Sequence, residues 1–232
     1  MKISPSLTLA AVFFAPFSVI SQAAQIVDLT LIGQLVPVAC DINLVGGAEV
    51  NYNVIPMSSL SSTKATPITP NMGGSDPIKT MTVICDAPAQ FAVKLLDNRA
   101  SSVNPLVLTG GLPAGTSADQ LFGLGQDSTS TNIGAYIVTA RSADLSVDGA
   151  AGKMIVSSDA GTSWVDSTAG QLLNTSAWRM SWTPAGAPSA PAPVATVSQG
   201  LGISAGIIPT ATLNTGNAIP LNGLLTLEVI YL

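Results

Sequence analysis

The sequence predicts an all-β sandwich, and three observations carry this prediction. Many short segments alternate apolar and polar residues with the two-residue period of a strand. Clusters of Gly, Pro, Asn, Asp and Ser separate these segments, as turns require. No segment shows a convincing helical period, and a chain of short strands with frequent turns folds as a sandwich. With 232 residues, the chain is long enough to bury the core of one large β domain.

The first 23 residues predict a secretory signal peptide. Lys2 supplies the positive end, residues 7–20 form a short apolar run, and Ser21-Gln22-Ala23 places small residues where a signal peptidase reads them. We expect cleavage after Ala23, export, and a single domain over residues 24–232. The apolar run is shorter than the roughly 20 residues of a membrane span, so no span is expected in the mature form.

Composition argues against nucleic-acid binding and against catalysis. Only 9% of the residues are charged and the net charge is -5, so few cations are available for phosphates. The chain has no histidine, which excludes Ser-His-Asp catalysis and His-ligated metals. The segment 61–64 fits an S-x-x-K pattern but lacks its companion motifs, so it is interpreted as a polar loop. We expect no enzyme activity and no cofactor.

Interior strands and loops follow from the same alternation and turn signals. Strands are expected over residues 49–55, 79–85, 90–96, 134–140, 153–157, 177–182, 194–199 and 201–207. Two long loops are expected over 113–132 and 184–193, the first with one helical turn after Ser117. Asp97-Asn98-Arg99 is interpreted as a turn in which side chains bond to the local backbone.

Both ends of the expected mature chain alternate strongly. At the start, the apolar positions of one face continue through Gly33 towards Val38, and they are Val27, Leu29, Leu31 and Leu35. The final segment, 224–232, places four residues on one face, namely Leu225, Leu227, Val229 and Tyr231. Chain ends usually fray, so a strand that reaches the last residue suggests that another segment pairs with it.

Two cysteines, Cys40 and Cys85, would enter an oxidising compartment if the chain is exported. An even count with no other thiol favours one intramolecular bridge, with two free thiols as the alternative. On the chain-entropy model, a bridge closing a loop of this length stabilises the fold by about 4 kcal/mol.

The two ends resemble those of chaperone-usher pilins, which begin with an alternating donor strand, pass through a Gly to a Cys, and end on a strand with a penultimate Tyr. The matching residues here are Val27, Leu29, Leu31, Gly33, Cys40 and Tyr231. The interior is also similar to a family of exported bacterial proteins of unassigned function that carry pilin-like ends on a longer body. That similarity rests on Cys85-Asp86-Ala87-Pro88, Asp97-Asn98-Arg99, Phe122-Gly123-Leu124-Gly125, Gly134-Ala135-Tyr136 and Tyr231-Leu232.

The resemblance to pilins implies an immunoglobulin-like sandwich that lacks its last strand and is completed by a donor strand from another subunit. Residues 24–36 would hold the donor, and residues 224–232 would line the acceptor. The expected function is a structural fimbrial-type subunit at the surface of a Gram-negative bacterium. Its expected partners are other fimbrial subunits, a periplasmic chaperone that caps the exposed edge, and an outer-membrane usher.

In two respects the chain departs from the pilin pattern. Its body is longer than a typical pilin, which suggests inserted strands or loops. Gly223 lies closer to the end of the chain than the Gly of the pilin motif, so the register of the acceptor stays open.

Two other functions stay open at this stage. In the first, residues 27–38 form the first strand of a complete sandwich, and the protein is a self-complete periplasmic monomer. In the second, the protein is a carbohydrate-binding minor adhesin, with Trp178 and Trp182 as a platform for a glycan receptor. Large aromatic residues in a sandwich more often fill its core.

Overall fold

The computed structural model describes residues 29–34, 38–167 and 170–232. The chain divides into two units, residues 1–36 and residues 37–232. Within the first unit, residues 29–34 belong to no strand, and Leu29 and Leu31 are 97% and 98% exposed. The expected signal peptide, Val27 and Leu35 lie outside the described residues.

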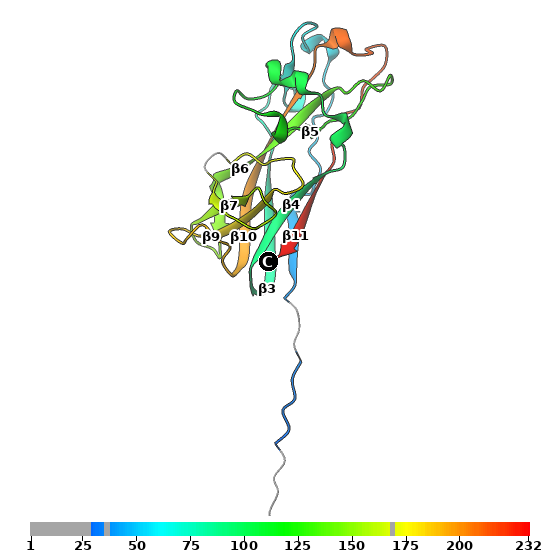
Figure 1. The fold of residues 1–232 in the computed structure, drawn as a ribbon. Helices are drawn as coiled ribbons and strands as arrows, with labels where there is room; N and C mark the ends of the chain where they lie inside the picture. The colour runs from blue at the N-terminus through cyan, green and yellow to red at the C-terminus, as the bar shows by residue number, and fades with distance from the viewer. Residues whose placement is uncertain (1–28, 35–37, 168–169) are drawn as a thin grey trace, which may run out of the picture. The chain divides into compact units, whose positions relative to one another are not determined.

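The second unit contains two antiparallel sheets (Figure 1). One has the order β1-β3-β10-β6-β5, with β2 paired to β10. Its strands are β1 (Cys40–Val45), β2 (Thr66–Ile68), β3 (Ile78–Ala89), β5 (Phe122–Gly123), β6 (Gly134–Val147) and β10 (Val194–Ile207). The other sheet has the order β11-β4-β9-β7-β8. Its strands are β4 (Phe91–Asp97), β7 (Gly152–Ser157), β8 (Val165–Asp166), β9 (Arg179–Pro184) and β11 (Leu225–Tyr231). The predicted all-β sandwich is confirmed.

The main core lies between the sheets and follows from strand alternation. Alternate residues of β3, such as Met81 and Val83, are fully buried, and so are Met180 and Trp182 of β9. The rings of Phe91 and Trp182 lie 5.9 Å apart at an interplanar angle of 47°, a tilted geometry that favours aromatic contact.

Most predicted strands are confirmed, and the differences have local causes. The strand expected over 49–55 is wrong, because this segment is irregular and Asn53 has a positive φ of 56°. The two strands expected over 194–199 and 201–207 are one strand, β10, because Gly200 stays in the ladder opposite Arg141. The helical turn after Ser117 is confirmed, and the Gln120 side-chain oxygen accepts a hydrogen bond from the Ser117 N–H.

Short 3-10 turns gather with the longer loops at one end of the sandwich, at the top of Figure 1. These turns are η1 (Met57–Ser59), η2 (Pro70–Met72), η3 (Ala100–Ser102), η4 (Pro105–Thr109), η5 (Ala118–Gln120) and η6 (Thr210–Thr212). We call this region the cap. It has its own small core, made of Val107, Leu112, Leu121, Ala135, Ile137 and Ile208. Residues 113–132 are thus partly folded into the cap, which accounts for some of the extra length of the body.

A close backbone approach fixes the cap to the first sheet. A Cβ atom at Gly206 of β10 would collide with the carbonyl oxygen of Gly111 in the cap. A Cβ at Gly202 of the same strand would meet no atom closer than 3.8 Å. Gly206 is therefore required by contact, whereas Gly202 is not.

We predict that Gly206→Ala lowers the free energy of unfolding by about 1 to 3 kcal/mol, the usual cost of overpacking. Gly202→Ala is the matched control on β10 and should change it by less than about 1 kcal/mol. Denaturant midpoints of the two variants check this. Equal midpoints would contradict the close packing of the cap on β10.

Candidate strand-acceptor site

Strands β1 and β11 are edge strands of the two sheets. In the described part of the chain, β1 pairs only with β3, and β11 pairs only with β4. The two strands adjoin at the lower end of the sandwich in Figure 1, where β1 is blue and β11 is red. An edge strand presents a row of unpaired backbone groups that can pair with another chain.

Alternation in an antiparallel ladder shows which groups of β1 are free. The Asp86 N–H donates to the Ala39 carbonyl oxygen at 3.0 Å, so every second residue from Ala39 onward faces β3. The backbone groups of the intervening residues, Cys40, Ile42 and Leu44, therefore point away from β3 towards the free edge.

The same argument applies to β11. The Asn98 N–H donates to the Leu224 oxygen at 2.9 Å, and the Leu232 N–H donates to the Gln90 oxygen at 3.1 Å. Even-numbered residues of β11 thus face β4, and the backbone groups of the odd-numbered residues point to the free edge. These odd-numbered residues are Leu225, Leu227, Val229 and Tyr231.

Residues with free backbone groups also carry the inward-facing apolar side chains. Ile42, Leu44, Leu225, Leu227 and Val229 pack against the main core, yet each is only half-buried. We call these residues, together with Cys40, the open edge. It combines unpaired hydrogen-bonding groups with incompletely buried apolar surface, and an added strand with alternating apolar side chains would satisfy both.

Charged groups near the open edge lie on the outer surface. Lys94 of β4 and Glu228 of β11 form an ion pair at 3.7 Å, and Glu228 is exposed. Asp41, between the inward-facing residues of β1, is also exposed. The inner side of the open edge is therefore apolar, which favours an apolar occupant.

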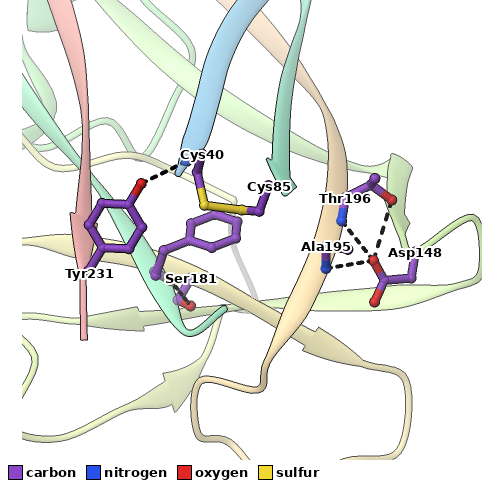
Figure 2. The surroundings of a disulfide bond; sticks show 8 residues. Cys40, Cys85, Asp148, Ser181, Ala195, Thr196 and Tyr231 are labelled. Atoms are coloured by element: carbon purple, nitrogen blue, oxygen red, sulfur yellow. Dashed lines mark hydrogen bonds between the residues drawn. A yellow bond between two sulfur atoms is a disulfide. The ribbon is translucent and has the colours of Figure 1, made fainter. Parts of the chain in front are cut away.

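The predicted Cys40–Cys85 disulfide is confirmed, and it lies at one end of the open edge (Figure 2). It joins the first residue of β1 to β3 across the ladder. At the same place, the Cys40 N–H donates a hydrogen bond to the Tyr231 hydroxyl at 2.7 Å. A structural disulfide is typical of an oxidising compartment, so the protein has an extracytoplasmic location.

The turn Asp97-Asn98-Arg99 lies at the other end of the open edge, where β11 begins. The Asp97 carboxylate accepts hydrogen bonds from the backbone N–H groups of Arg99 at 2.8 Å and Gly123 at 2.9 Å. The Asn98 side-chain amide donates to Thr226 at 2.8 Å. The turn interpretation is confirmed for this segment, and the turn joins β4, β5 and β11.

A close contact also explains a glycine of the Phe122-Gly123-Leu124-Gly125 motif. A Cβ atom at Gly123 would collide with the Arg99 carbonyl oxygen. Two motifs that lie 23 residues or more apart in sequence therefore pack directly against each other.

The two expected halves of a donor-acceptor pair belong to different units of the chain. Of the residues expected in the donor, Leu29, Leu31 and Gly33 are described and all are exposed. The residues expected in the acceptor, Leu225, Leu227, Val229 and Tyr231, all belong to the C-terminal strand β11, and that strand is confirmed. Sequence reasoning missed β1, the second wall of the open edge, although the segment Cys40–Val45 has the same alternation.

Trp178 and Trp182 do not form an exposed platform. They are 2% and 0% exposed and belong to the main core, next to the fully buried Met180. A sugar ring stacks on an open aromatic face, so this structure corrects the glycan-platform interpretation of these two residues. Trp164 is half-buried, and its indole N–H donates to the Gly161 oxygen at 3.1 Å.

Two aspartates outside the open edge have pKa values lowered to about 2 by hydrogen bonds. For Asp127, the largest cause is the bond from the Asn214 backbone N–H, followed by bonds from Thr129 and Thr131. For Asp159, the largest cause is the bond from the Ser157 side chain, followed by bonds from Ser163. Both carboxylates hold their loops in place, because their oxygen atoms accept hydrogen bonds from neighbouring loop residues.

Within residues 29–34, 38–167 and 170–232, no three His, Cys, Asp or Glu side chains gather as a metal site. Over the same described ranges, no helix is long and apolar enough to cross a membrane.

Comparison with known proteins gives two similarities. Residues 29–137, slightly less than half of the chain, match the model of a family described as protein of unknown function (DUF1120). The chain is also 29% identical over 159 residues to Protein GltF of Escherichia coli (strain K12). That alignment covers 66% of this chain and 59% of GltF. The matched residues 29–137 include both cysteines of the disulfide, and neither description states an activity.

Proposed function

We propose that the protein is a structural, fimbrial-type subunit that joins its neighbours by exchanging β-strands. The observation that carries this proposal is the open edge. Two edge strands present free backbone groups and half-buried apolar side chains on the same residues. An extended segment from another copy would pair with both and complete the sandwich.

The proposed donor is residues 25–35 of the neighbouring copy. Its apolar face consists of Val27, Leu29, Leu31 and Leu35. Leu29 and Leu31 are almost fully exposed in the described part of this segment. Burying Leu29 and Leu31 would contribute roughly 1.5 to 3 kcal/mol each, against the entropy lost when the segment becomes ordered.

The partners that we propose follow from the cost of leaving the open edge uncovered. An exposed apolar strand edge aggregates, so a subunit of this kind needs a partner that covers this edge before it meets its neighbour. A periplasmic chaperone would cover the edge, and an outer-membrane usher would receive the subunit at the cell surface. The disulfide supports the periplasmic part of this route.

The first prediction concerns the donor. Leu29→Asp should abolish assembly into oligomers, because a charge would enter the apolar open edge. Thr30→Asp is the matched control, since Thr30 lies on the opposite face of the alternating segment and would remain in solvent. Sedimentation of the two exported variants tests this. Oligomers of Leu29→Asp like those of Thr30→Asp would contradict the proposed donor.

A second prediction concerns both sides of the joint. Leu29→Asp removes the donor but keeps the open edge, whereas Leu227→Asp disrupts the open edge but keeps the donor. Each variant alone should stay monomeric, and an equal mixture should form one heterodimer and nothing larger, because only one productive joint exists.

Native mass spectrometry of the mixture distinguishes these species. The circular dichroism of Leu227→Asp must match the wild type, and Val229→Asp replaces it if it does not. Oligomers in either variant alone, or no heterodimer in the mixture, would contradict strand exchange.

A further inference from the structure

The open edge is asymmetric, because a hydrogen bond joins its two strands at one end. We infer that Tyr231 is a positioning residue that closes the open edge at Cys40 and limits how far a donor strand can enter. This inference rests on the proposed function, because it concerns the register of the donor on the same open edge.

Tyr231 uses a backbone group that a donor would otherwise need. The Cys40 N–H points to the free edge of β1 by the alternation of the ladder. The Tyr231 hydroxyl already accepts the hydrogen bond from this N–H at 2.7 Å (Figure 2). A donor strand can therefore pair with Ile42 and Leu44 but not with the Cys40 N–H, unless it displaces the phenol.

Both ends of this link are fixed in the fold. Cys40 is bonded covalently to Cys85 of β3, and Tyr231 is paired with Phe91 of β4. The link thus joins one sheet to the other. In the described part of the chain, no other hydrogen bond joins β1 to β11, so this link distinguishes the Cys40 end of the open edge from the Val45 and Leu225 end.

A stop at Tyr231 selects which donor residues are buried. Three inward positions of β11 lie before the stop, namely Leu225, Leu227 and Val229. The alternating donor positions are 27, 29, 31, 33 and 35, and position 33 is a glycine that buries no side chain. The one set of three consecutive apolar positions is Val27, Leu29 and Leu31. The geometry therefore assigns these three to the open edge and leaves Leu35 outside.

Tyr231→Phe removes the hydroxyl alone and tests this inference directly. Each protein carries Leu29→Asp and Leu31→Asp to silence its own donor, and a synthetic peptide of residues 25–35 is added. Amide hydrogen exchange is followed at Cys40, Ile42 and Leu44. Tyr136→Phe is the control, because Tyr136 is a buried residue of β6 that stacks on Phe122 and lies beside Gly223, at the Leu225 end of the open edge and not at Cys40.

Without peptide, we expect the Cys40 amide to exchange roughly tenfold faster in Tyr231→Phe than in the wild-type or Tyr136→Phe background, through loss of one hydrogen bond. With peptide, Ile42 and Leu44 should gain protection in every protein. Cys40 should gain protection only in Tyr231→Phe, because the donor can then extend past the missing stop. A peptide with Leu35→Asp should protect the wild-type background as well as the parent peptide does.

Four outcomes would overturn the inference, and they are distinguishable. Equal Cys40 exchange without peptide would show that the phenol does not protect this amide. Protection of Ile42 and Leu44 without any change at Cys40 in Tyr231→Phe, or failure of the Leu35→Asp peptide, would overturn the stop alone. No protection by the parent peptide in any protein would overturn strand acceptance itself and the stop with it.

Discussion

Among the residues that the structure describes, the edge strands β1 and β11 each pair with a single neighbour, and the rest of the arrangement depends on this feature. Buried backbone groups in proteins are almost always paired, and apolar side chains of a sandwich are normally covered from both sheets. Along β1 and β11, Ile42, Leu44, Leu225, Leu227 and Val229 have backbone groups without a partner strand and side chains that are only half-buried. An added strand would pair with these backbone groups and cover these side chains, and this constraint connects the sandwich to its proposed function.

Several features hold these edges in position. The disulfide fixes the start of β1 to β3, and the Asp97 turn fixes the start of β11 beside β5. Tyr231 joins the two strands at the end nearest the disulfide. The cap rests on the upper part of the first sheet through the close approach of Gly111 and Gly206, and it leaves β1 and β11 as edges. The edges are thus held in a fixed geometry, which lowers the entropy cost of accepting another strand.

Local patterns in the sequence predicted most of this fold. Alternation located β3, β4, β6, β7, β9 and β11, because their inward residues are mostly apolar. The same rule failed at residues 49–55, where Asn53 has a positive φ that alternation does not reveal. It also missed β1, because the alternation of the donor segment placed the first strand before Cys40. The pairing of β1 beside β11 is a long-range arrangement, and local alternation carries no information about it.

The candidate site was predicted in part for the same reason. The alternating residues Leu225, Leu227, Val229 and Tyr231 of β11 could be predicted from alternation, and the disulfide from the count of cysteines. The Tyr231–Cys40 hydrogen bond joins residues 191 positions apart, and only the folded geometry brings them together. Alternation placed Trp178 and Trp182 on one face, and the tendency of large aromatic residues to fill the core of a sandwich is confirmed for both.

The central claim is that the open edge accepts a strand, and thermal unfolding tests it most directly. The measurement uses the chain with Leu29→Asp and Leu31→Asp, with and without the peptide of residues 25–35. The account predicts that the parent peptide raises the midpoint strongly and in a concentration-dependent way, whereas a peptide carrying the same two substitutions has no effect. An unfolding transition that is identical with and without the parent peptide would contradict the account and would show a sandwich that is complete by itself.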